Sequence, residues 1–209
     1  MNPLSAFLPA ILIAATMTAS PAFATAEEPL EIVRVTTEEL YKRVDADREL
    51  FEKDVSKLRN VVREVLIPRV DKIYSARLVL GRAGRDLERQ QVEEFADALS
   101  ELLIKQYADV LLEFKDRDQV QVLDLVGDNT ERMTRVRTRI RLPSGARVPV
   151  DYVFRKSGGE WVIFDVIAEG ISYVATFRNQ IGEQIRQEGF DRVLDRIRGG
   201  ELEVEFHEP

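Results

Sequence analysis

Cysteine is absent from this chain of 209 residues, and histidine occurs once, as His207 close to the carboxyl end. Without cysteine the protein has no disulfide bond and no thiol nucleophile. The single histidine disfavours a Ser/His/Asp triad and the usual zinc ligand sets. A phosphate-binding GxxxxGK loop is missing too, because Gly81-Arg82-Ala83-Gly84 is too short and lacks the lysine. Nucleotide hydrolysis is therefore disfavoured.

Charged side chains are missing from residues 1–26, and the stretch 4–19 is almost wholly apolar. This stretch is followed by Ala22-Phe23-Ala24, with small residues at the two positions that a signal peptidase reads. We therefore expect residues 1–24 to be a secretory signal peptide, although its start lacks the usual Lys or Arg. An uncleaved membrane anchor is the alternative, and the prolines and threonines of the segment favour cleavage.

The mature chain, residues 25–209, carries the whole net charge of −7 because the leader is uncharged. An acidic protein is poorly suited to nucleic acid, or to a broadly anionic membrane surface, as its main partner. With 44% hydrophobic and 32% charged residues, the composition predicts one globular domain that buries its own core.

The first half of the mature chain shows helical periodicity in three stretches. After a short extended lead, a helix is expected from the capping-box pattern of Thr36 and Glu39 to the break at Pro68. A shorter helix should cover residues 70–80 and end at Gly81. A long one should run over residues 86–114 and pack on a sheet, because its apolar residues form a wide stripe.

The second half predicts that sheet. Strands are expected at residues 120–126 and 132–142, followed by a hairpin with arms at 151–155 and 161–167. Short loops join these four strands, so the sheet should be antiparallel and the fold class α+β, with several helices covering the sheet.

The hairpin should pass directly into a helix. Gly170 permits the abrupt change of direction, and Ser172 is a suitable N-cap for the apolar-periodic run that follows. Gly189 should interrupt this helix before a last short one, and the acidic end of the chain should be a tail.

Three features of the predicted sheet leave their interpretation open. Asp165, in mid-strand, suits either a backbone-bonding role or a carboxylic acid of raised pKa in a conical enzyme pocket together with Tyr152. The alternating arginines of the second strand suit either a solvated face or a surface that docks a lipid headgroup or an acidic partner. The many aromatic residues suit either a filled core or a lined cavity.

Several blocks of the chain resemble the MlaC-type periplasmic phospholipid-binding proteins, also called toluene-tolerance or auxiliary ABC-transporter components. The likeness spans about Thr37 to Arg198, and one departure is Gly84, where the family usually has an aromatic residue. The blocks that carry it, in chain order, are Pro68-Arg69-Val70-Asp71, Leu78-Val79-Leu80-Gly81, Gln91 to Phe95 with Tyr107, Asp151-Tyr152, Trp161 to Val166, and Glu169-Gly170-Ile171-Ser172 with Arg178.

The resemblance implies a monomeric, non-enzymatic carrier that holds a phospholipid as cargo and needs no cofactor or metal. Such a carrier shuttles lipid across the periplasm between an inner-membrane ABC transporter complex and an outer-membrane lipoprotein complex, and so maintains the lipid asymmetry of the outer membrane. Opening should involve movement of helices relative to the sheet, hinged near residues 81–84 or Gly170.

An apolar pocket for the acyl chains is then expected inside the fold, because water-exposed chains are too unfavourable. The side chains expected to line it are Val70, Tyr74, Leu78, Leu99, Leu102, Leu103, Val136, Ile140, Tyr152, Phe154, Trp161, Ile163, Ile171, Val174 and Phe177. The small enzyme with a pocket around Asp165 and Tyr152 remains the alternative.

Overall fold

The structure, a computed structural model, describes residues 28–125 and 129–202. The expected signal peptide, the last residue of the strand expected at residues 120–126, and His207 all fall outside these ranges. The helices of the first half are α1 (Pro29–Ala46), α2 (Arg48–Lys53), α3 (Val55–Leu66), η1 (Ile67–Arg69), α4 (Lys72–Leu80), α5 (Arg89–Tyr107), η2 (Ala108–Glu113) and η3 (Arg117–Gln119). The rest of the chain forms β1 (Val120–Val122), β2 (Met133–Arg141), β3 (Arg147–Ser157), β4 (Glu160–Ala168), β5 (Ile171–Ser172), α6 (Tyr173–Glu188) and α7 (Phe190–Gly199).

The strands form one antiparallel sheet in the order β1-β2-β3-β4-β5, so the α+β class and the meander are confirmed. The sequence predicted four strands, and the structure adds the two-residue β5. Along β2 the arginines at odd positions are exposed, whereas Val136 and Thr138 between them are buried. One face of the sheet is therefore apolar and covered, and the other is open and basic.

The helical start of the chain differs from the prediction. The expected extended lead is helical, since α1 begins at Pro29, whose fixed φ suits the first position of a helix. The single helix expected up to Pro68 is three helices, because the chain bends at Asp47 and again at Asp54, which caps α3 through the backbone N–H of Ser56. Helical spacing alone did not reveal these bends.

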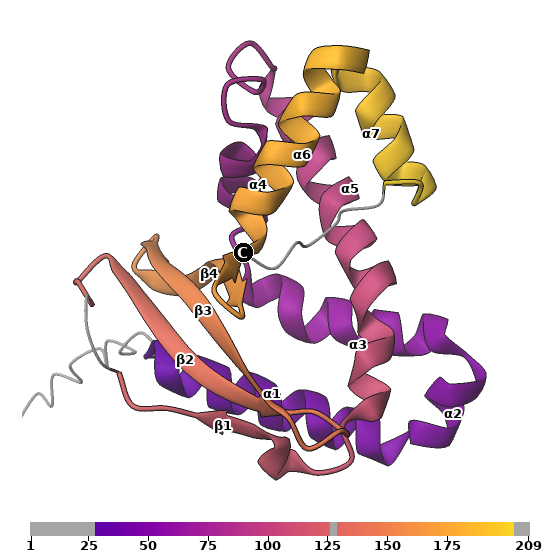
Figure 1. Cartoon of the computed structure of the whole chain (residues 1–209), viewed down its shortest axis with the longest axis vertical. Helices are drawn as coiled ribbons and strands as arrows, with labels where there is room; N and C mark the ends of the chain where they lie inside the picture. Colours follow the sequence, from indigo (N-terminus) through magenta and orange to yellow (C-terminus); the bar gives the residue numbers. More distant parts are fainter. Residues whose placement is uncertain (1–27, 126–128, 203–209) are drawn as a thin grey trace, which may run out of the picture.

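The long helix α5 was predicted to lie on the sheet, and this was wrong. It packs against α4 and α7, and α1 takes the place on β1 and β2 instead. In Figure 1, α4 to α7 form a helical layer beside the sheet, and α1 runs along the far face of β1 and β2. Other helices bury the apolar stripe of α5. The helical periodicity of apolar residues predicts that one face is buried, but not whether a helix or a sheet covers it.

The buried side chains fall into three clusters rather than one core. The helical cluster joins α4 to α7 and includes Phe95, Phe177 and Ile181. A second cluster joins α1 to α3 with the end of α5. The sheet cluster places Val136 and Phe154 against α1. Because the clusters are separate, a cavity is most easily accommodated in the regions where they meet. None of the helices in the described ranges combines the length and apolar character needed to cross a membrane.

Candidate functional site

A small apolar cavity of about 120 Å³ lies between α1 and the covered face of the sheet. It sits where the second cluster, represented by Val44 and Leu111, meets the sheet cluster, represented by Tyr152. The side chains that line it are Thr37, Leu40, Tyr41, Val44, Leu111, Phe114, Asp116, Val120, Ile140 and Tyr152. We refer to this space as the α1–sheet cavity.

Tyr152 provides the aromatic wall of the cavity from the middle of the sheet. It pairs with Val136 on β2 and with Val166 on β4, so its side chain belongs to the covered face. Burial raises the pKa of the Tyr152 phenol to about 12, because the phenolate cannot be solvated there. The site is thus apolar enough to disfavour charge in the middle of the sheet.

This shift predicts a loss of stability in alkali. The phenol titrates near pH 10 in the unfolded chain, so between about pH 10 and 12 the folded chain keeps a proton that the unfolded chain loses. The free energy of unfolding should therefore fall by roughly 2–3 kcal/mol across that window, at about 1.4 kcal/mol per pH unit. Urea unfolding at several pH values should show this slope, and the slope should be smaller in Tyr152→Phe. Burial also raises the pKa of Tyr107 and Tyr173. Both of these tyrosines remain in the Tyr152→Phe variant, so only the difference in slope between the wild type and the variant reports on Tyr152.

The residues expected to line one pocket lie in several places. Ile140 and Tyr152 line the α1–sheet cavity. Val136, Phe154, Trp161 and Ile163 belong to the sheet cluster beside it, and Val70 forms a bridge to Ile163. Leu99, Leu102, Leu103, Val174 and Phe177 belong to the helical cluster, and Leu78 and Ile171 are half-buried on α4 and β5. Their contact with an acyl chain stays a prediction.

Tyr74 and Trp161 line a wider hollow of about 950 Å³ at the opposite end of β3. Charged side chains cover both rings: Arg155 lies 4.2 Å from the centre of the Tyr74 ring, and Lys156 lies 5.2 Å from that of Trp161. Arg155 also pairs with Asp71. Rings covered by cations are partly polar on that side, which suits a solvated hollow better than an acyl-chain wall.

Asp165 has a structural role at the start of α6. It pairs across the sheet with Val153, the neighbour of Tyr152, so Asp165 and Tyr152 point to opposite faces of the sheet. Its carboxylate accepts hydrogen bonds from the Ser172 hydroxyl at 2.6 Å and from the Val174 N–H at 3.0 Å, and Ser172 Oγ accepts one from the Ala175 N–H. Asp165 and Ser172 together satisfy the first turn of the helix, as the N-cap prediction for Ser172 required. The geometry gives no conical pocket shared by Asp165 and Tyr152.

Replacing Asp165 by alanine should therefore reduce stability. Losing the carboxylate leaves N–H and O–H donors at the start of α6 without their acceptor, a loss of about 1–2 kcal/mol in the free energy of unfolding. Chemical denaturation measures this, with Asp195→Ala on the exposed side of α7 as the charge-matched control. Equal stability of the two variants would contradict the capping role.

The cavity wall from α1 was missed by the sequence prediction. Leu40 and Val44 fall in the helix expected between Thr36 and Pro68, but their helical spacing did not indicate that they lie over a cavity. Leu111 and Phe114 were assigned to a continuous helix, whereas the helix changes at Ala108 into η2, which brings both residues to the cavity. Pro29 at the start of α1 was the available signal for the earlier helix start.

A metal site is not indicated within residues 28–125 and 129–202, where no three acidic side chains form a group able to hold an ion. Gly84, the departure from the family pattern, lies in the loop between α4 and α5, away from the α1–sheet cavity. A Cβ at this position would approach Leu80 Cβ to 2.7 Å, so a larger residue requires the loop to shift.

Comparison with known proteins gives consistent matches over most of the chain. The sequence is 25% identical over 174 residues to the intermembrane phospholipid transport system binding protein MlaC of Haemophilus influenzae, covering 81% of this chain and 80% of that protein. It is 26% identical over 173 residues to the toluene tolerance protein ttg2D of Pseudomonas putida, with the same coverage.

A solved structure shares the fold. The phospholipid-binding protein from Ralstonia solanacearum, determined in complex with a phospholipid, superposes with a TM-score of 0.72 at 20% identity and covers 82% of this chain and 99% of its own. The sequence model of the MlaC protein family matches residues 34–199, which is most of the chain. The chain therefore belongs to the MlaC family.

Proposed function

We propose that this protein is a phospholipid carrier of the periplasm, exported by a signal peptide at residues 1–24 and then acting as a single domain without enzymatic activity. The observation that carries the proposal is the family match over residues 34–199, together with relatives named for phospholipid transport or solved with a phospholipid. The lipid would be exchanged with an inner-membrane ABC transporter complex and an outer-membrane lipoprotein complex.

Enclosure of the acyl chains is the physical requirement of such a carrier. Two chains contain roughly 30 methylenes, and each contributes about 0.8 kcal/mol when it leaves water, so exposure would cost on the order of 20 kcal/mol. The α1–sheet cavity supports the proposal because it is apolar and bounded by the covered face of the sheet. Its volume of about 120 Å³ is smaller than the roughly 300–1,000 Å³ typical of ligand pockets, so the walls must move apart to admit a lipid.

We infer that α1 is the wall that moves. It meets the sheet through apolar side chains such as Ile32 and Val33, whereas its Tyr41 and Arg43 bond to Lys115 and Glu64, outside the sheet. Apolar contacts are non-directional and can be exchanged for acyl-chain contacts at little cost.

By contrast, helix α4 is tied to the sheet by hydrogen bonds to β4. The Asp71 N–H donates to Ile163 O, and the Ser75 hydroxyl donates to Phe164 O, each at 2.8 Å. These directional bonds oppose a movement of α4 away from the strand. Hinge motion near residues 81–84 or Gly170 stays a prediction, and full hydrogen-exchange protection at both places with and without lipid would contradict it.

Phospholipid transfer tests the proposal directly. The mature protein should extract labelled phospholipid from donor vesicles, remain in the supernatant after sedimentation, and release the label to acceptor vesicles. Ile140→Asp should abolish this uptake by placing a carboxylate beside the chains, whereas Gln121→Asp on the exposed edge strand β1 makes the same change of charge and should not. A protein that takes up no lipid, or two variants that behave alike, would contradict the proposal.

A further inference from the structure

A hollow of about 850 Å³ lies between the end of α4, the loop that follows it, and one face of α6. In Figure 1 this loop lies beside α6 at the end of the helical layer farthest from the sheet. The residues that line the hollow are Leu80, Gly81, Arg82, Ala83, Arg85, Arg178, Asn179, Gly182 and Arg186. We call it the arginine groove. It shares no lining residue with the α1–sheet cavity.

Four arginines from two distant segments of the chain meet in this groove, and no carboxylate is among its lining residues. Arg82, Arg85 and Arg178 are exposed and form no ion pair with any residue that the structure describes, whereas Arg186 pairs with Glu183. Clustered like charges repel one another, and the chain as a whole has a net charge of −7. The groove is therefore a local positive site on an acidic protein.

The backbone shapes the groove around these arginines. Gly81 turns the chain at φ +52°, and the aliphatic part of Arg178 passes close to it, 3.4 Å from where a Cβ would stand. On α6, Gly182 lies four residues after Arg178 and four before Arg186, so the three share one helical face. A Cβ on Gly182 would meet nothing within 4 Å, which leaves the floor open between the two arginines.

We propose that the arginine groove binds a phosphate monoester, supplied either by a soluble metabolite or by a lipid headgroup at a membrane surface. A guanidinium offers two parallel N–H donors that match phosphate oxygens. A phosphate monoester carries about −1.5 to −2 charge on three terminal oxygens, so one group can accept from several arginines at once. A carboxylate has two oxygens and one charge and matches the cluster less well. The volume also lies within the roughly 300–1,000 Å³ of small-ligand sites.

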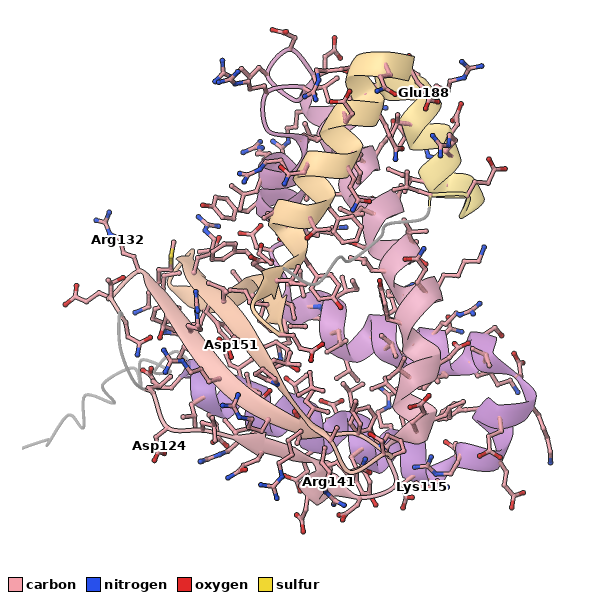
Figure 2. The ribbon with its side chains drawn as sticks, in the orientation of Figure 1. Lys115, Asp124, Arg132, Arg141, Asp151 and Glu188 are labelled. Atoms are coloured by element: carbon pink, nitrogen blue, oxygen red, sulfur yellow. The ribbon has the colours of Figure 1, made fainter. Side chains whose placement is uncertain are left out.

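The exposed face of the sheet supplies a control of equal charge. Arg137 and Arg139 project from β2, are exposed, and line neither the groove nor the cavity. Figure 2 shows this face, with Arg141 at one end of β2, Asp151 on β3, and Arg132 just before the other end. Asp151 lies 3.6 Å from Arg135 and Asp116 lies 3.1 Å from Arg141, so carboxylates partly neutralise this ladder. None of its arginines at positions 135, 137, 139 and 141 lines the arginine groove, the α1–sheet cavity or the hollow beside Tyr74.

Titrating the mature protein with glycerol 3-phosphate tests the soluble source. Binding is monitored by calorimetry and by the amide resonances of Gly81 and Gly182. Sedimentation with vesicles that contain phosphatidic acid, a lipid whose headgroup is a phosphate monoester, compared with phosphatidylcholine vesicles, tests the headgroup source. The double variant Arg82→Gln, Arg178→Gln should weaken whichever binding occurs at least about tenfold, equivalent to 1.4 kcal/mol. Arg137→Gln with Arg139→Gln should change it less than about twofold, because phosphate contacts at the groove are retained.

Gly182→Leu tests the site without changing charge. Leucine favours the helix more than glycine, so folding is retained while its side chain occupies the groove floor, and phosphate binding should fall. The proposal is overturned if neither probe binds, if the two arginine pairs matter equally, or if a glutamate-rich peptide binds the groove more tightly than both phosphate probes. Gly182→Leu alters neither the α1–sheet cavity nor the expected hinges, so its phospholipid uptake from phosphatidylcholine vesicles should equal that of the wild type, which separates this test from that of the carrier function.

Discussion

Locking α1 to the sheet with a disulfide is expected to slow the exchange of phospholipid by at least about 100-fold, because a bond of about 2 Å between sulfurs prevents the cavity from widening. A cysteine at Val33 or Ile32 paired with one at Val136 joins the two walls, since these side chains share the sheet cluster. The natural chain has no cysteine, so no competing disulfide can form.

Reduction provides the control for this experiment. The same chain with its two thiols reduced should exchange lipid at close to the rate of the wild type, and circular dichroism should show the same fold in both states. Unchanged exchange in the fully oxidised chain would show that α1 is not the moving wall. It would leave the carrier function intact and direct attention to the hinges near residues 81–84 or Gly170.

Truncating Phe154 to alanine should lower the free energy of unfolding of the lipid-free protein by about 3–5 kcal/mol. The Phe154 side chain is fully buried between α1 and the sheet, so its removal leaves a void that the surrounding strands cannot close. Bound phospholipid should recover part of this loss, because acyl methylenes can occupy the void at about 0.8 kcal/mol each. Urea unfolding with and without lipid measures both quantities.

Phe95→Ala is the matched variant, since Phe95 is equally buried but lies in the helical cluster. It should lose a similar amount of stability, and lipid should restore none of that specific loss. Recovery in both variants, or in neither, would indicate that the residues around Phe154 form a filled core and that the acyl chains lie elsewhere. The pair thus decides between the two interpretations of the aromatic residues that the sequence left open.

Much of the fold was predictable from local chemistry. The hairpin of β3 and β4, the turn at Gly170 and the N-cap at Ser172 were all predicted, because each depends on residues close together in sequence. Arginine alternation on β2 correctly indicated which face of the sheet is open. These features need no knowledge of which element packs on which.

The errors arose where a distant partner decides the outcome. The stripe on α5 is as apolar as one that covers a sheet, but α4 and α7 bury it. The α1–sheet cavity depends on α1 lying over β1 and β2 and on η2 bringing Leu111 and Phe114 to it. For the same reason the sequence did not reveal how the apolar side chains group into separate clusters, and it gave no indication that Arg82 and Arg178 would meet.

Native mass spectrometry of the mature protein, purified from a periplasmic extract without detergent, tests the central claim most directly. The carrier account predicts a stoichiometric adduct with the mass of a phospholipid, and solvent extraction of the same sample should identify that lipid. A mass equal to that of the polypeptide alone, unchanged after mixing with phospholipid vesicles, would contradict the account.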